Sequence, residues 1–143
     1  MNVALIQMVS SQKLEVNLRE AETLIAEAAS GADYIFLPEN FAVLASENPR
    51  RIGNLEMTRE GPIRSFLRDI ARRHSCWLFG GTFPLACRPD GSLVSRGRVR
   101  AASLVLDPEG VEVRRYDKIH MFDVDVVDNQ GAYRESDSYE PGG

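Results

Sequence analysis

The stretch Tyr-Ile-Phe-Leu-Pro-Glu-Asn at residues 34–40 is a short apolar run that ends in a proline and a carboxylate. Ahead of it, apolar residues recur at spacings of three and four between Leu14 and Ala28, which is typical of an amphipathic helix. Residues 2–9 form another short apolar run. The order predicts a strand, a helix and a second strand, paired in parallel because a crossover of this length returns the chain in the same direction. Glu39 then lies at the carboxyl end of the second strand.

The ends of these elements carry their own signals. Ser10 or Ser11 is expected to cap the start of the first helix, and Gly31 is expected to end it in a left-handed conformation. A second helix is predicted from Pro62, whose fixed φ suits a first helical turn, to His74.

Three further strands are predicted after the second helix. Residues 77–83 form one, and residues 98–107 alternate like a strand covered on both faces. After an Asp-Pro-Glu-Gly turn, residues 111–116 return as its antiparallel partner. Periodicity is lost after Lys118, and residues 123–143 are predicted to be a polar loop. Five strands and two helices make an α/β fold with nothing to cover the last strand.

Composition narrows the class of protein. The chain has 143 residues, of which 43% are hydrophobic, so we expect one domain or a piece of one. Its net charge of −4, with both signs mixed, disfavours a nucleic-acid partner. Residues 1–9 lack the features of a signal peptide, and no run approaches the ~20 apolar residues that span a bilayer. Cys76 and Cys87 lack metal or disulfide spacing. We therefore expect a soluble, cytoplasmic protein with free thiols.

Glu39 and Lys118 each follow a predicted strand, where a rigid sheet can present reactive side chains. An acyl-transfer site needs a base, a cationic clamp for an oxyanion and a nucleophile, and these two residues suit the first two roles. Capping or surface roles are the alternative. Several other residues have structural interpretations: packing or loop roles for His74 and His120, close approach of the sheet to a neighbour for Gly80-Gly81, and solvated strand faces or edge protection for Arg96, Arg98, Arg100, Arg114 and Arg115.

Three blocks carry a resemblance to a known family: Leu-Pro-Glu-Asn at 37–40, Tyr-Asp-Lys-Ile-His-Met-Phe-Asp-Val-Asp at 116–125 and Tyr-Arg-Glu-Ser-Asp-Ser-Tyr-Glu-Pro-Gly at 133–142. Together with the opening at 3–8 and the Gly-Gly-Thr at 80–82, they resemble the nitrilase superfamily of carbon-nitrogen hydrolases. They are most similar to the amidase branch that includes omega-amidase and deaminated glutathione amidase. The resemblance covers the whole chain.

The resemblance implies an α-β-β-α sandwich that hydrolyses amides or nitriles with a Glu-Lys-Cys triad and without a metal or organic cofactor. By motif, Glu39 would be the general base, Lys118 would stabilise the oxyanion, and Glu135 would orient the lysine and substrate. The family's nucleophilic cysteine lies beyond the Pro-Gly of the third block, and neither Cys76 nor Cys87 has its surroundings.

Residues 1–143 are thus predicted to be the N-terminal portion of a single carbon-nitrogen hydrolase domain, a partial sandwich that is inactive alone. The full-length form would act on a small carboxylated amide. Its incomplete sheet predicts association or homo-oligomers. The alternative is a non-catalytic assembly or interaction module, in which Glu39 and Lys118 merely form a buried ion pair.

Overall fold

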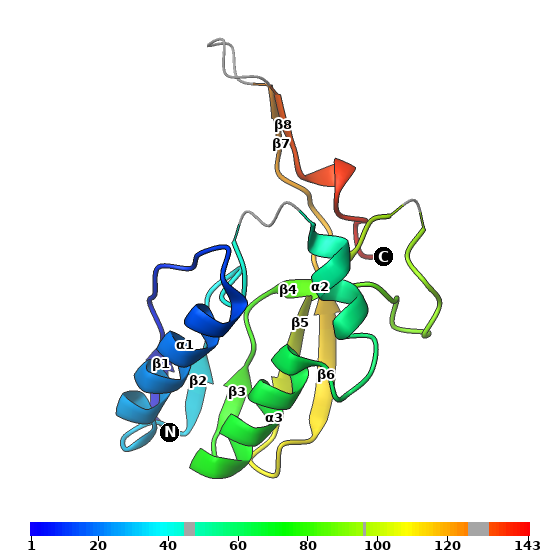
Figure 1. Ribbon diagram of the computed structural model, residues 1–143. Helices are drawn as coiled ribbons and strands as arrows, with labels where there is room; N and C mark the ends of the chain where they lie inside the picture. The colour runs from blue at the N-terminus through cyan, green and yellow to red at the C-terminus, as the bar shows by residue number, and fades with distance from the viewer. Residues whose placement is uncertain (45–47, 96, 126–131) are drawn as a thin grey trace.

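The computed structural model describes residues 1–44, 48–95, 97–125 and 132–143 (Figure 1). In these residues a six-stranded sheet has the order β1-β2-β3-β5-β4, with β6 also paired to β5, and a separate hairpin contains β7 and β8. The elements are β1 (Val3–Leu5), α1 (Leu14–Ala29), β2 (Tyr34–Phe36), α2 (Pro49–Leu55), α3 (Pro62–His74), β3 (Trp77–Phe79), β4 (Phe83–Leu85), β5 (Arg100–Leu106), β6 (Glu112–Asp117), β7 (Asp123–Asp125), β8 (Ala132–Arg134) and the short 3-10 helix η1 (Glu135–Asp137).

The predicted strand-helix-strand unit is present. Strands β1 and β2 are parallel, and β3 joins β2 in parallel. Helices α1 and α3 lie side by side on the same face of the sheet (Figure 1). Their inward side chains, such as Ile25 and Leu67, are fully buried with Ile35 and Leu78 of the sheet. This face therefore holds the hydrophobic core.

Both predicted signals at the ends of α1 were wrong. Lys13 occupies the N-cap position and makes no side-chain cap bond. The Ser11 hydroxyl instead donates to Oδ1 of the buried Asn17, whose amide nitrogen donates to the Ala42 carbonyl at 2.8 Å. At the other end, the right-handed Ser30 caps the helix, and Gly31 does not have a positive φ. Asn17 consequently ties the helix start to the chain that follows Glu39.

The strand predicted at residues 77–83 is broken in two by its glycines. Gly81 has a φ of 43°, and a Cβ there would lie 2.0 Å from the Pro38 carbonyl oxygen. The predicted close approach is confirmed, and it brings the chain before Glu39 against the β3–β4 connection. Helix α2, which packs on β4, was not predicted because seven residues are too few for a clear periodicity.

Strand β5 is covered on one face and partly open on the other. Its antiparallel pairing with β6 is confirmed. Leu104 and Leu106 are buried, as expected, but Val105 on the opposite face is only partly buried. The strand register aligns Val105 with Phe79, Phe36 and Leu5 on the neighbouring strands, so these side chains share one face of the sheet. We call this the open face; it comprises Val3, Leu5, Tyr34, Phe36, Trp77, Phe79 and Val105. No second layer covers it among the described residues.

The predicted polar loop at residues 123–143 was wrong where it is described. Strands β7 and β8 form an antiparallel hairpin that projects from one end of the sheet, and η1 follows it (Figure 1). Residues 126–131 lie outside the described part. The chain then returns to the sheet, where Tyr139 pairs in parallel with Val99. The hairpin forms by backbone pairing between polar strands, which apolar periodicity does not reveal.

The arginines fall into two groups. Arg114 is exposed on the edge strand β6, as expected. Arg98, Arg100 and Arg115 instead belong to an ion-pair cluster with Glu140 and Asp117, so their predicted solvated positions were wrong. Arg96 lies outside the described residues. In the part of the chain that the structure describes, none of the helices is long and apolar enough to cross a membrane.

Candidate active site

Glu39 lies three residues after the end of β2, in a turn that contacts with the β3–β4 segment hold in place. The N–H of Leu37 donates to the Phe79 carbonyl at 2.9 Å and continues the parallel pairing. Asn40 has a φ of 54°, and its N–H donates to Thr82 Oγ1 at 2.9 Å. Asparagine tolerates this left-handed conformation better than most residues. The strand end therefore places the Glu39 side chain at the carboxyl edge of the sheet.

Lys118 lies immediately after β6 and is held through its backbone. Its N–H donates to the Ala101 carbonyl at 3.0 Å, and its own carbonyl accepts the N–H of Gly142 at 2.8 Å. A Cβ on Gly142 would lie 2.4 Å from the Asp117 carbonyl oxygen, so a glycine permits this approach. Strand β5 and the chain that returns after η1 thus fix Lys118 from two sides.

Glu135 begins η1 at the base of the hairpin. Its N–H donates to the Phe122 carbonyl at 3.2 Å, and its carboxylate oxygen Oε2 accepts the Phe122 N–H at 2.7 Å. The side chain is 9% exposed. A carboxylate held by a backbone N–H in a nearly buried position has little freedom to move.

The three residues meet at the lysine ammonium. Lys118 Nζ lies 2.8 Å from Glu39 Oε1, and 3.1 Å and 2.9 Å from the two oxygens of Glu135. The Glu39 side chain is 56% exposed and that of Lys118 is 23% exposed. The structure therefore brings together every residue that the motifs singled out, and the Glu39 side chain is the most exposed of the three.

The electrostatic surroundings keep Lys118 charged. Burial disfavours the ammonium form, but hydrogen bonds and charges from Glu39 and Glu135 outweigh it and raise the pKa of Lys118 above its ordinary value. A permanent ammonium suits stabilisation of developing negative charge better than formation of a Schiff base, which needs the neutral amine.

Comparison with known proteins places this chain in a family. Residues 2–143 match the carbon-nitrogen hydrolase family. The chain belongs to that family. It is 38% identical over 141 residues to the deaminated glutathione amidase of Yersinia enterocolitica, covering 99% of this chain and 47% of that protein. It is 31% identical over 144 residues to omega-amidase NIT2 of Danio rerio, covering 98% of this chain and 47% of that protein.

The solved structures agree on the fold. Nit3 of Saccharomyces cerevisiae, a member of the nitrilase superfamily, superposes with a TM-score of 0.78 at 24% identity, over 100% of this chain and 49% of that one. This carbon-nitrogen hydrolase chain thus has the mixed α/β fold of the superfamily, with a sheet that is not closed. It spans about half the length of the curated relatives that it matches.

Neither cysteine of this carbon-nitrogen hydrolase chain has the setting of a nucleophile. Cys76 lies between α3 and β3 and is 1% exposed, and burial raises the pKa of its thiol. Cys87 is also buried, and its carbonyl accepts a hydrogen bond from Arg115. A reactive thiol needs an accessible, electropositive position that lowers its pKa. No group of three His, Cys, Asp or Glu side chains in the described residues could hold a metal ion.

Behind Lys118 lies the ion-pair cluster, which sequence analysis missed. Arg115 binds Asp117 through both nitrogens of one edge, at 2.7 Å and 3.0 Å, and Arg100 links Asp117 to Glu140. Arg88 also binds Glu140. The cluster anchors residues 139–142 beside the strand end that carries Lys118. Arg98 and Arg100 are two residues apart, a spacing that puts side chains on the same face of a strand. That spacing was the available sequence signal for the cluster, but the acidic partners are distant in sequence.

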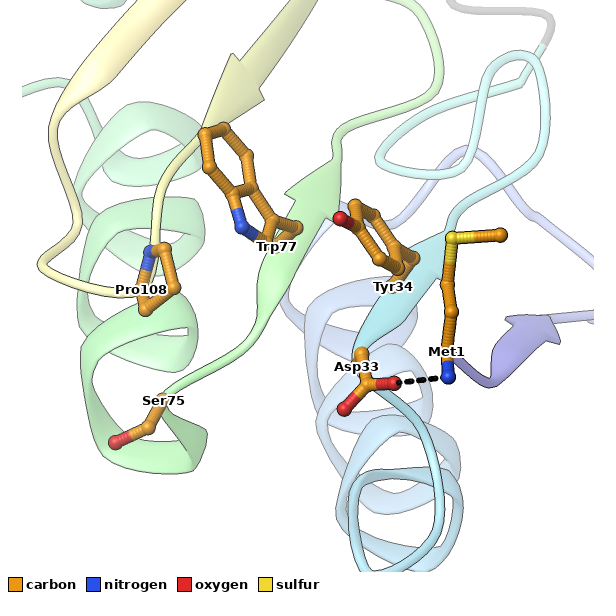
Figure 2. A pocket seen from close by; sticks show the side chains of 6 residues that line it. All are labelled: Met1, Asp33, Tyr34, Ser75, Trp77 and Pro108. Atoms are coloured by element: carbon orange, nitrogen blue, oxygen red, sulfur yellow. Dashed lines mark ion pairs between the residues drawn. The ribbon is translucent and has the colours of Figure 1, made fainter.

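A hollow lies at the end of the strands opposite to Glu39 and Lys118 (Figure 2). It is lined by Met1, Asp33, Tyr34, Ser75, Trp77 and Pro108. Asp33 precedes β2, whereas Glu39 follows it, so the two sites face opposite edges of the sheet. Asp33 accepts the Asn2 N–H at 2.7 Å and lies 3.5 Å from the N-terminal ammonium group. Its charge is therefore already paired, and the hollow offers no comparable reactive group.

Proposed function

We propose that this chain contributes the base, the cation and the orienting carboxylate of an amidase that cleaves the carbon-nitrogen bond of a small carboxylated amide. The carrying observation is the contact of Lys118 Nζ with both Glu39 and Glu135. In this proposal Glu39 is the general base, Lys118 stabilises the oxyanion, and Glu135 orients Lys118. The amidase names of the relatives support the reaction class.

The proposed reaction proceeds through a thioester. Glu39 takes the proton of a cysteine thiol, whose sulfur attacks the amide carbon, and the Lys118 ammonium stabilises the negative oxygen that forms. The carbon-nitrogen bond then breaks, and the nitrogen leaves with the proton from Glu39. Glu39 next deprotonates a water molecule, which hydrolyses the thioester to the acid and restores the thiol. The nucleophilic thiol is not among the two cysteines of this chain, so we expect the 143 residues to be inactive alone.

The exposure of the site favours catalysis over a purely structural ion pair. A buried pair would seclude both charges, whereas the Glu39 side chain is 56% exposed. Exposed ion pairs contribute about 0–1 kcal/mol to stability, so stability gives little reason for the Glu39–Lys118 pair; the nearly buried Glu135 holds Lys118 from the other side. An accessible carboxylate beside an ammonium ion is the arrangement that an incoming thiol and amide require.

The direct test is release of ammonia from a small omega-amide. The 143-residue chain should give none above the blank; turnover that Cys76→Ala or Cys87→Ala abolishes would overturn our placement of the nucleophile. An extended reading frame that adds a cysteine at a strand-to-helix turn should be active. Glu39→Gln and Lys118→Met should each lower its kcat by about 10²–10⁴-fold, because each removes a group of the transition state. Glu109→Gln, in an exposed turn, is the matched control and should have no effect.

We further propose that the chain acts in the cytoplasm on a small molecule, without a nucleic-acid or membrane partner, and that copies of it associate through the open face. The mixed charges and free thiols support the first part. The apolar side chains of the open face support the second, since water contact with such a surface is unfavourable.

A further inference from the structure

Asp123 makes an unusual contact across the base of the β7–β8 hairpin. It begins β7 and lies opposite Arg134, the last residue of β8. Its Oδ1 accepts the N–H of Ser136 at 3.0 Å, two residues beyond the strand. The contact therefore joins the chain that leaves Lys118 to the helical turn that carries Glu135.

This contact replaces a missing helix cap. The first N–H groups of a helical turn lack partners within the turn, and the residue at the N-cap commonly supplies an oxygen. Arg134 holds the N-cap position of η1 and makes no side-chain cap bond. Asp123 supplies that oxygen from the opposite strand. The Ser136 hydroxyl contributes a second hydrogen bond, and both keep the pKa of Asp123 below its ordinary value.

The main-chain N–H and carbonyl of Glu135 are both hydrogen-bonded. Its N–H donates to Phe122, and its carbonyl accepts the N–H groups of Ser138 and Tyr139 at 3.0 Å and 2.9 Å. The direction of the chain at the next residue is set by the bond from Ser136 to Asp123. With the backbone so fixed, the carboxylate points to the Phe122 N–H and to Lys118 Nζ.

We propose that Asp123 is a positioning residue of the site: by capping η1 from across the hairpin, it holds the Glu135 carboxylate against Lys118. Its importance for catalysis rests on the function proposed above, but the contact acts in the 143-residue chain itself. Asp123 is exposed and touches neither Glu39 nor Lys118 in the described contacts, so it acts through Glu135.

The test is the pKa of the Lys118 ammonium, measured by NMR on the labelled 143-residue chain. Glu39 and Glu135 are the charged groups that face it. Glu135→Gln removes one of these charges, and the decrease that it causes in the Lys118 pKa is the reference for the other variants. Asp123→Ala should lower the Lys118 pKa by at least half of that amount, because the carboxylate loses its fixed position. Asp123→Asn keeps an oxygen for the Ser136 N–H and should cause less than a quarter of it.

The pair of variants separates position from charge. An Asp123→Asn chain whose Lys118 pKa falls as far as in Asp123→Ala would show a through-space charge effect and overturn the proposal. An unchanged pKa in Asp123→Ala would overturn it as well. If the backbone amides of β5 and α3 remain protected from hydrogen exchange, the variants are folded.

The unmodified chain provides a second measurement, in case Asp123→Ala does not fold. The Ser136 amide resonance should shift with pH as Asp123 titrates, with a midpoint below the ordinary aspartate value of 3.8. A Ser136 amide that follows no such titration would refute the capping contact. Because neither measurement uses turnover, a failure of this proposal is distinguishable from a failure of the proposed hydrolysis.

Discussion

The two faces of the sheet place the same residue type in opposite surroundings. Leu78 of β3 is completely buried under the helices, whereas Leu5 of β1, on the open face, is 78% exposed. The covered face is completed by α1 and α3 of this chain. The open face is apolar but has no cover among the described residues, so its side chains suit a packing partner that these residues do not supply.

The open face is partly protected by its own aromatic residues. Phe36 and Phe79 stack with ring centroids 4.0 Å apart, and Tyr34 and Trp77 lie 6.3 Å apart with nearly parallel rings. Such pairs contribute about 0.5–1.5 kcal/mol beyond the area that they bury. The difference between the faces therefore shows where stability originates: the covered face supplies the core, and the open face is the surface through which we propose that copies associate.

Leu78→Ala should give the largest loss, because it leaves a cavity in the covered face. Truncation of a fully buried leucine costs about 2–5 kcal/mol, and the surrounding strands and helices can close only part of the space. Denaturant unfolding followed by tryptophan fluorescence measures the loss. A cost below 1 kcal/mol would mean that the helices do not pack on this face as described.

The contrast between the faces was only half predictable from the sequence. Helix periodicity and short apolar runs located α1, α3 and most strands, because those patterns reflect burial against a single face. The run at 98–107 predicted cover on both sides, but alternation along one strand cannot reveal whether a second layer is present. Helix α2 and the hairpin were missed because short elements held by distant contacts leave no periodic pattern.

Glu56→Gln tests the helix that covers the core, with a smaller expected effect. The carboxylate of Glu56 is fully buried and accepts the N–H groups of Ile63 and Arg64, at 2.8 Å and 3.0 Å, at the start of α3. Glutamine has one acceptor oxygen for two donors, so the variant should lose about 1–3 kcal/mol.

The pH dependence of that loss has a definite sign. Desolvation raises the pKa of Glu56 above 4.5 despite its two hydrogen bonds. A raised carboxyl pKa contributes stability that is fully present below the unfolded value and is lost as the pH rises through the folded value. The difference between the unmodified chain and Glu56→Gln should thus be larger at pH 4 than at pH 7. The opposite trend would show that the hydrogen bonds outweigh desolvation.

The residues of the candidate site were easier to predict from the sequence than the contacts that hold those residues in position. The motifs singled out Glu39, Lys118 and Glu135, and the fold brings the two carboxylates within 3.1 Å of the Lys118 ammonium. Asp117 and Asp123 lie inside the block at residues 116–125, yet their partners, an arginine cluster and a helical turn, lie outside it. Only the pairing of distant segments brings those groups together, so no local pattern indicated them.

Glu39→Gln tests the carboxyl edge of the sheet, where the covered face and the open face meet. Its effect on stability should be small. One exposed partner of Lys118 is lost, which costs about 0–1 kcal/mol. Since the pKa of Lys118 is raised above 10.5, its contribution is fully present below that value and is lost as the pH rises through the folded pKa. Unfolding curves of the two chains should therefore converge at strongly alkaline pH; a constant gap would mean that Glu39 stabilises the fold without Lys118.

Leu5→Thr should have the smallest effect on stability and yet a clear effect on association. Threonine favours strands, and a side chain that is 78% exposed has little burial to lose, so the change should stay within about 0.5 kcal/mol. Sedimentation velocity should show weaker self-association, because an apolar side chain leaves the open face. Leu93→Thr is the matched control: Leu93 is 54% exposed but lies in a loop outside the sheet. If both variants weakened association equally, general surface hydrophobicity would explain it, and the open face would lose its special role.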